Sequence, residues 1–131
     1  MRAEALDGVE DPNHISAVVR VRYGSFAALL TGDAGAEAEG ELVRRFGGGL
    51  RSQLLKAGHH GSTTSTSAAF LGAVQPELVV ISAGRRNRYG HPHADVLRRL
   101  AERGVRVART DREGTVSVLA DAAGQWRRPE D

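Results

Sequence analysis

The stretch that most constrains the fold is residues 54–62, a short apolar run that ends in two adjacent histidines followed by Gly-Ser. A brief apolar run of this kind is typical of a buried strand. Open α/β sheets place their ligands just past the carboxyl ends of such strands. His59 and His60 therefore stand where a sheet of this class carries its chemistry. Two imidazoles there could bind a metal, exchange a proton or contact a phosphate.

Length and composition indicate one soluble globular domain. The 131 residues are 40% hydrophobic and 26% charged, which is ordinary for a chain with a modest core. No apolar run reaches the roughly eighteen residues of a transmembrane helix. The first residues also lack the apolar region of a signal peptide, so we expect a soluble chain and leave its compartment open. Cysteine is absent, which leaves His, Asp and Glu as the strong metal ligands.

The charges point to one local cluster rather than to a basic surface. The net charge of +2 is too small to attract nucleic acid in general. Of the 18 lysine and arginine residues, Lys56 is the only lysine, an imbalance that compositional bias explains. Residues 85–88 hold three arginines around Asn87. Because a guanidinium suits bidentate contacts with phosphate, this segment is either a phosphate-binding loop or an exposed, solvated one.

Strands and helices alternate along the chain. The hydrophobic pattern predicts strands at residues 15–23, 25–31, 53–57, 78–82, 105–109 and 115–119. The first two form a hairpin, and so do the last two, whose turn is residues 111–114. Helices are expected at residues 34–46, 68–74 and 93–103. The first has glutamates early and arginines late, as the helix dipole favours, and a hydroxyl of the preceding loop caps the second.

The ends of the chain are interpreted as peripheral. Residues 1–14 form an irregular lead-in, and residues 121–131 form a tail with a short strand near Trp126 that then frays. Between them, the interleaved elements predict an α/β or α+β fold with a mixed sheet, built as a single domain over residues 1–131.

Polar side chains follow three of the predicted strands. Asp33 ends the strand at residues 25–31, His59 and His60 follow the next, and His91 lies in the loop after residues 78–82. If these strands share one edge of a sheet, the groups converge there. A carboxylate with imidazoles is a ligand set for a divalent metal. Such a metal would lower the pKa of a bound water and stabilise charge on a phosphoryl or acyl oxygen.

Each group also has a structural interpretation. Asp33 could cap the helix that follows it, and His91 could be a turn residue before a proline. His93 is expected to cap or flank its helix, and the sequence shows no partner for His14.

The adjacent histidines are a special case. From an extended backbone, His59 and His60 cannot both point the same way. One of them is therefore expected to face the core or to support the ligands from behind.

Four motifs in this order resemble the C-terminal metallo-β-lactamase-like domain of ComEC, the family of channel proteins for DNA uptake in natural transformation. They are residues 29–33 (Leu-Leu-Thr-Gly-Asp), residues 54–62, residues 81–92 (ending in Tyr-Gly-His-Pro) and residues 110–115. The similarity covers residues 13–119 and opens at residues 13–16, which resemble the family's segment before the Gly-Asp motif.

The resemblance implies half of an αββα sandwich with a two-metal hydrolase site, holding zinc or manganese, that acts as a nuclease on the non-transported DNA strand. By that likeness Asp33 would bridge the metals, and one of His59 and His60 would bind the second metal, with His59 favoured because it lies closer to the strand. His91 would lie nearby as a catalytic neighbour or a contact for the substrate phosphate. The expected substrate-binding residues, with single-stranded DNA as the partner, are Ser62, Asn87, Arg88 and Tyr89.

One departure from the family pattern is serious. Enzymes of the metallo-β-lactamase fold carry a His-x-His-x-Asp-His-like motif in their N-terminal half, and nothing in this sequence matches it. The chain therefore resembles only the C-terminal half, without the channel that attaches the family to the bacterial inner membrane. A half-site should hold metal weakly, because protein sites use three or four ligands. Half a sandwich would also leave a sheet face uncovered, which favours self-association or binding of the N-terminal half.

Three functions are compatible with these residues. The first is a ComEC-type hydrolase that cleaves DNA phosphodiesters when an N-terminal half completes it. The second is another metallo-β-lactamase-fold phosphodiesterase or esterase with a small substrate. The third is a non-catalytic module that keeps the half-fold for assembly.

Overall fold

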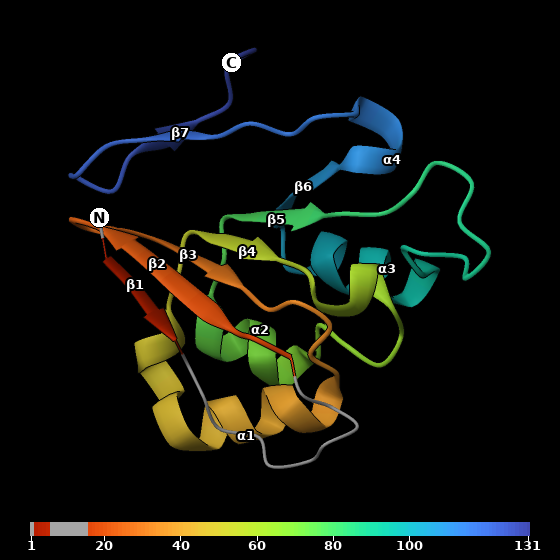
Figure 1. The fold of residues 1–131 in the computed structure, drawn as a ribbon, viewed down its shortest axis with the longest axis horizontal. Coiled ribbons are helices and arrows are strands. Elements are labelled where there is room, and N and C mark those ends of the chain that lie inside the picture. The colour runs from red at the N-terminus through yellow and green to blue at the C-terminus, as the bar shows by residue number, and fades with distance from the viewer. Residues whose placement is uncertain (1, 6–15) are drawn as a thin grey trace.

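Six strands lie side by side in one mixed sheet within residues 2–5 and 16–131, which are the residues that this computed structural model describes (Figure 1). They are β1 (Arg2–Ala5), β2 (Val19–Tyr23), β3 (Phe26–Leu30), β4 (Leu54–Lys56), β5 (Leu78–Ile81) and β6 (Arg106–Arg109), in that order across the sheet, and a separate small sheet pairs β7 (Leu119–Ala120) with β8 (Trp126–Arg127). The helices are α1 (Ala36–Phe46), α2 (Ala68–Val74), α3 (Ala94–Glu102) and α4 (Thr110–Glu113), with 3-10 turns η1 (Gly47–Leu50) and η2 (Gly58–Gly61). The predicted α/β class with a mixed sheet is confirmed.

The sheet has an antiparallel part and a parallel part. β1, β2 and β3 pair antiparallel, which confirms the hairpin predicted from residues 15–31. β3, β4, β5 and β6 then pair parallel. Because parallel strands end at the same edge of a sheet, the segments that follow β3, β4 and β5 emerge next to one another.

A buried apolar row holds the parallel strands in register. Leu29, Leu55 and Val79 are partners across β3, β4 and β5, and none of them is exposed to solvent. They belong to one core with side chains of α1 and α2, which lie together on one side of the sheet (Figure 1). Burial of each such side chain is worth about 1.5–3 kcal/mol. The core therefore fixes where each strand ends, and with it where the next polar residue stands.

The helix ends settle two of the structural alternatives. Gly35 stands at the N-cap of α1, and none of the described side chains caps that helix, so Asp33 is not its cap. His93 does cap α3, because its Nδ1 accepts the backbone N–H of Asp95 at 3.2 Å. Ser67 caps α2 in the same way, as predicted for the hydroxyl-rich loop. None of the helices formed by the described residues is long and apolar enough to cross a membrane.

The hairpin predicted from residues 105–119 is wrong. Its expected turn is the short helix α4, and β6 pairs with β5 instead of with a following strand. Residues 115–118, all of them described, form no strand, and β7 pairs with β8. Long-range hydrogen bonds explain the difference, because Thr110 Oγ1 accepts the backbone N–H of Ala83 at 2.9 Å and donates to the carbonyl of Ala83 at 3.0 Å. These contacts hold the segment after β6 against β5.

Both chain ends are more ordered than predicted. β1 pairs with β2, so the irregular lead-in is wrong for Arg2–Ala5; the predictions that involve residues 13–15, His14 among them, lie outside the described residues. The short strand near Trp126 is confirmed as β8. Beyond it the chain does not fray, because Arg128 is buried and pairs with Glu113 at 2.6 Å while Asp131 pairs with Arg106 at 2.7 Å.

The sheet face opposite α1 and α2 is only partly covered. The hairpin of β7 and β8 lies over this side of the sheet (Figure 1). Strand alternation places Phe26 and Leu78 on that face, where both are buried, whereas Leu30 is 39% exposed and Tyr23 is exposed as well. Apolar side chains therefore remain in contact with solvent on this face.

Candidate functional site

The edge at which β3, β4 and β5 end brings the four predicted site residues together. Asp33 follows β3, His59 and His60 lie in η2 after β4, and His91 lies in the loop between β5 and α3. His60 Nε2 is 3.4 Å from Asp33 Oδ1. The rings of His59 and His91 meet edge to face with centroids 5.7 Å apart. These residues converge, as expected from their positions after the predicted strands. Their catalytic and metal-binding roles stay predictions.

An unusual backbone turns both adjacent histidines outward. His59 has φ 45° and ψ 43°, and His60 has φ 55° and ψ 28°, so both adopt the left-handed conformation. The extended backbone assumed from the sequence is wrong, and neither ring faces the core, because both residues are exposed. Such a conformation costs about 1–3 kcal/mol for each residue that is not glycine, and strain of this kind gathers at functional sites. The turn therefore marks this edge as a place where side-chain direction matters.

The position of His60 depends on a backbone carbonyl of the neighbouring strand. His60 Nδ1 is 2.7 Å from the carbonyl oxygen of Ser82. A carbonyl can only accept, so Nδ1 carries the hydrogen, and in the neutral imidazole Nε2 then presents a lone pair toward the carboxylate of Asp33. Two acceptors that face each other attract a cation between them. Orientation of an imidazole by a backbone carbonyl is also the usual arrangement behind a metal-binding histidine.

The turn after β3 holds Asp33 against this edge. Gly32 has φ 54°, and a Cβ there would lie 2.3 Å from Ser16 Oγ, so only glycine fits without movement. The backbone N–H of Asp33 donates to Ser16 Oγ at 2.7 Å. Thr31 Oγ1 donates to the carbonyl of Lys56 at 2.7 Å and ties this turn to β4. The carboxylate itself is 67% exposed and free to bind a ligand.

Lys56 is a site residue that the sequence interpretation missed. Its Nζ donates to the carbonyl of Gly32 at 3.1 Å and to that of Ala57 at 3.2 Å, so it joins the two turns that carry Asp33 and the histidines. Burial lowers the pKa of Lys56, and the nearby carboxylate of Asp33 opposes this shift. A signal was present, because this is the one lysine in a chain that otherwise uses arginine. A compact ammonium fits between two carbonyls where a planar guanidinium does not.

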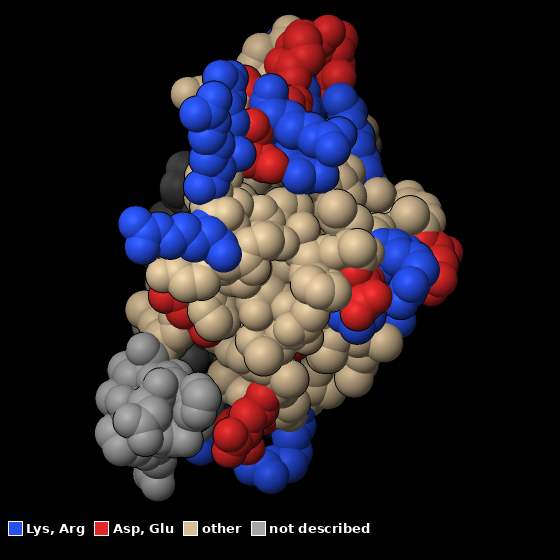
Figure 2. All heavy atoms as spheres, turned by 90° about the vertical axis from the view of Figure 1, so that its right-hand side faces the viewer, with Lys and Arg blue, Asp and Glu red and all other residues tan. Residues whose placement is uncertain are grey.

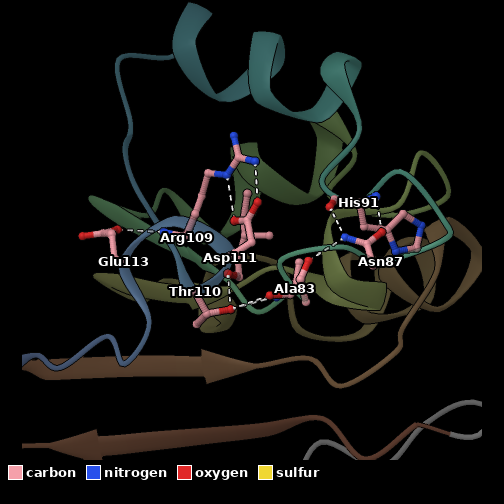
Figure 3. A network of polar contacts seen from close by, with 9 residues as sticks. Ala83, Asn87, His91, Arg109, Thr110, Asp111 and Glu113 are labelled. Carbon is pink, nitrogen blue, oxygen red and sulfur yellow. Dashed lines mark hydrogen bonds and ion pairs between the residues drawn. The ribbon is translucent and has the colours of Figure 1, made fainter.

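Asn87 fixes the loop that carries His91. Asn87 Oδ1 accepts the backbone N–H of His91 at 2.8 Å, and Asn87 Nδ2 donates to the carbonyls of His91 and Gly84 at 2.6 Å and 2.9 Å (Figure 3). Its amide is thus engaged inside the loop, which favours a positioning role over the substrate contact predicted from the sequence. Burial lowers the pKa of the His91 imidazole, and the charges of His59, His60 and His93 lower it further. The lowered pKa favours the uncharged form of the His91 imidazole.

The hydroxyl-rich loop supports His59 from behind. Ser62 is buried, and its Oγ accepts the backbone N–H of Thr64 at 3.3 Å, so it is badly placed for the predicted substrate contact. Thr64 Oγ1 lies 3.4 Å from His59 Nδ1. The loop is anchored by Glu39, a fully buried carboxylate that accepts the backbone N–H groups of Thr66 and Ser67 at 2.5 Å and 2.9 Å. Burial raises the pKa of Glu39.

Two predicted substrate residues are open to solvent. Tyr89 is 79% exposed and stacks on His91, with centroids 5.6 Å apart. Arg88 is exposed beside it, as are Arg85 and Arg86. Figure 2 shows the side of the molecule that carries this edge, with basic and acidic groups around an uncharged centre.

The edge offers a partial ligand set. No group of three or more His, Asp or Glu side chains within residues 2–5 and 16–131 is placed to hold one metal ion. The pair of Asp33 and His60 fits two positions of a divalent metal site, since a carboxylate oxygen and an oriented imidazole nitrogen face each other there. The residues fit a metal, and further ligands are needed to complete its coordination.

The fold and this edge define an α/β protein with a carboxylate and imidazoles gathered at the ends of parallel strands. No protein-family model matches the chain. Over 106 residues, or 81% of the chain, it is 46% identical to the competence protein ComA of Neisseria gonorrhoeae. It is 42% identical over 104 residues to the ComE operon protein 3 of Bacillus subtilis, and 41% identical over 106 residues to the recombination protein 2 of Haemophilus influenzae. These proteins are homologues over most of this chain, and the chain spans 15%, 13% and 13% of their lengths, respectively.

Proposed function

We propose that the chain is the C-terminal part of a metallo-β-lactamase-fold hydrolase of the ComEC type, which cleaves DNA phosphodiester bonds as part of DNA uptake. The observation that carries this proposal is the pair of Asp33 and His60, 3.4 Å apart at the ends of parallel strands, with the imidazole oriented by the Ser82 carbonyl. The name of a homologue, competence protein ComA, supports the link to DNA uptake.

The chemistry would be divided between a metal and the side chains around it. A divalent ion, zinc or manganese, would supply a water of lowered pKa and stabilise charge on the phosphoryl oxygens. Asp33 and His60 would hold the ion, and the geometry favours His60 over His59 for this role. His59 and His91 flank the pair, and the uncharged His91 imidazole can donate one hydrogen bond to a phosphate oxygen. Tyr89 and Arg88 would contact the rest of the strand.

The remaining ligands would come from another polypeptide segment, the N-terminal half of the same fold. Two ligands hold a divalent ion weakly, because protein sites use three or four. The homologues are several times longer than this chain, so they have room for such a segment. The exposed apolar side chains of Leu30 and Tyr23 would be covered by it. Self-association of the chain is the competing arrangement. Sedimentation of the purified chain separates the two arrangements, because a monomeric chain excludes self-association.

Cleavage of a labelled single-stranded oligonucleotide in millimolar Mn²⁺ tests the hydrolase, since a high concentration of metal fills a weak site. Asp33→Asn is expected to reduce cleavage by about 100-fold or more, because even residues that only support a ligand are worth 10- to 100-fold. Asp95→Asn is the matched control: Asp95 also faces a histidine, with 3.7 Å between His93 Nδ1 and Asp95 Oδ2, and it is 48% exposed. Equal cleavage by wild type and Asp33→Asn would contradict the assigned site. Absence of cleavage by the chain joined to the N-terminal half of its fold, with Mn²⁺ bound at Asp33, would contradict the hydrolase and leave an assembly module.

The open shape of the site favours a polymer over a small substrate. A hollow of about 390 Å³ lies against β7 and β8, lined by residues such as Leu119 and Trp126, and none of the site histidines lines it. Asp33 and His60 stand instead on an exposed edge, where an extended strand can pass. Hydrolysis of bis(p-nitrophenyl) phosphate without cleavage of DNA would favour the small-substrate esterase instead.

A further inference from the structure

We propose that residues 84–91, the recognition loop, bind a single strand of DNA by stacking one unpaired base on Tyr89 while the arginines of the loop contact the adjacent phosphates. The inference deepens the proposed function, on which it rests for the identity of the polymer, and it adds how an unpaired strand is told from a duplex.

Tyr89 is an exposed ring that is already held in place. One of its faces stacks on His91 at 5.6 Å and 29°, and His91 in turn meets His59 at 5.7 Å. Because 79% of the residue is exposed, the opposite face of the ring is open. The three rings form a row from solvent to His59, the residue before His60. A ring that is ordered before binding loses little entropy when a base stacks on it.

Stacking explains a preference for an unpaired strand. Every base has a π face, and stacking on an aromatic side chain is worth about 1–3 kcal/mol per base. In a duplex both faces of each base are taken by its neighbours, so a ring such as Tyr89 finds no free face except at an end. The tyrosine therefore selects for single strands without selecting a sequence.

The charge of the recognition loop is uncompensated. Arg85, Arg86 and Arg88 are exposed, and none of them makes a hydrogen bond or ion pair to the described residues, whereas Arg109 and Arg128 are each held by a carboxylate. The loop itself contains no aspartate or glutamate. A guanidinium without a protein partner is free to bind a phosphate through two hydrogen bonds. An acidic peptide would satisfy these arginines too, but it would make no use of the Tyr89 face.

The loop has a fixed shape before any ligand binds. Asn87 makes hydrogen bonds to the backbone of Gly84 and of His91, which closes the loop on itself (Figure 3). Thr110 Oγ1 bonds both the N–H and the carbonyl of Ala83 at its base. The tyrosine and the arginines are thus presented from a braced segment.

Fluorescence anisotropy with labelled oligo(dT), in EDTA so that no metal contributes, tests the inference. Wild type is expected to bind oligo(dT) more tightly than a hairpin duplex of equal length. Tyr89→Ala should weaken oligo(dT) binding by about 5- to 150-fold, the equivalent of 1–3 kcal/mol, and leave duplex binding unchanged. Tyr89→Phe keeps the ring and should retain wild-type affinity. Tyr23→Ala removes another exposed tyrosine, on β2, and serves as the matched control.

The arginines are tested through the salt dependence of the same binding. Each phosphate contact on a single strand adds about −0.7 to the slope of log K against log salt concentration. Replacing Arg85, Arg86 and Arg88 by alanine should therefore make the slope less negative by about 2. Arg98→Ala, which removes an exposed arginine paired with Asp95, should leave it unchanged.

The failure of this inference differs from the failure of the hydrolase. If Tyr89→Ala binds oligo(dT) like wild type while its melting temperature is unchanged, or if duplex binds as tightly as single strand, the stacking site is refuted whatever the cleavage assay shows. If Tyr89→Ala loses binding but Asp33→Asn has no effect on cleavage, the recognition loop stands and the hydrolase falls. Tighter binding of oligo(U) than of oligo(dT) would overturn the assignment to DNA.

Discussion

Replacing Glu39 by glutamine is expected to destabilise the fold by about 2 kcal/mol. The carboxylate is fully buried and accepts two backbone N–H groups, those of Thr66 and Ser67. A glutamine amide offers one oxygen, so it satisfies one N–H and turns its own NH₂ toward the other. A buried donor without a partner costs about 1–3 kcal/mol, and relief from burying a charge offsets part of this loss.

The pH dependence of stability provides a second measurement on the same variant. The ordinary pKa of a glutamate carboxyl is 4.5, and burial raises the pKa of Glu39 in the folded chain. Above 4.5 and below the raised value, the folded state binds more protons than the unfolded state, so the contribution of this group to stability falls as pH rises. Glu39→Gln cannot titrate, and its stability should lack this component of the slope.

Urea denaturation followed by circular dichroism measures both effects, and the melting temperature should drop by about 8 °C for a loss of 2 kcal/mol in a domain of this size. Glu41→Gln is the matched control. Glu41 lies two residues after Glu39 in α1 and bonds Arg45 at 3.1 Å on the surface. A surface ion pair is worth about 0–1 kcal/mol. A Glu39→Gln chain as stable as Glu41→Gln would refute the anchoring of the hydroxyl-rich loop.

Two further outcomes follow from the contacts around the site and the tail. Lys56→Met removes the Nζ that bonds the carbonyls of Gly32 and Ala57. It should lower Mn²⁺ affinity about 10-fold, as loss of a supporting residue does, and Lys56→Arg should not restore this affinity. Unchanged metal binding in Lys56→Met would contradict the role of Lys56 in holding the two turns together. Arg106 lowers the pKa of Asp131 from 3.8 to about 2, so this carboxylate contributes stability above 3.8 that is lost as pH falls toward 2. Acid unfolding of Asp131→Asn should show a shallower decline in that window, and an identical decline would mean that the pair does not contribute.

The convergence of the site could be predicted because it depends on strand ends. Asp33, His60 and His91 each follow an apolar run, and parallel pairing alone brings such residues to one edge. The direction of the side chains could not be predicted. Two successive left-handed residues that are not glycine carry no compositional signal, so the extended backbone assumed for His59 and His60 is wrong.

The remaining errors come from contacts between distant residues. The hairpin expected after β6 was lost to hydrogen bonds between Ala83 and Thr110, which are 27 residues apart. The place of Glu39 early in α1 matches the helix dipole, but its hydrogen-bond partners lie 27 and 28 residues away in the hydroxyl-rich loop. Local pattern and propensity do not contain these pairings, which tertiary packing decides.

Titration of the isotope-labelled chain with Mn²⁺, followed by NMR, tests most directly that the pair of Asp33 and His60 is the metal site. Mn²⁺ broadens the resonances of the nuclei nearest to it, so the broadened residues show where a weakly bound ion lies. The resonances of Asp33 and His60 are expected to broaden first, and Asp33→Asn should abolish this effect while Asp95→Asn leaves it intact. Broadening that centres on His93 and Asp95, or that persists unchanged in Asp33→Asn, would contradict the account.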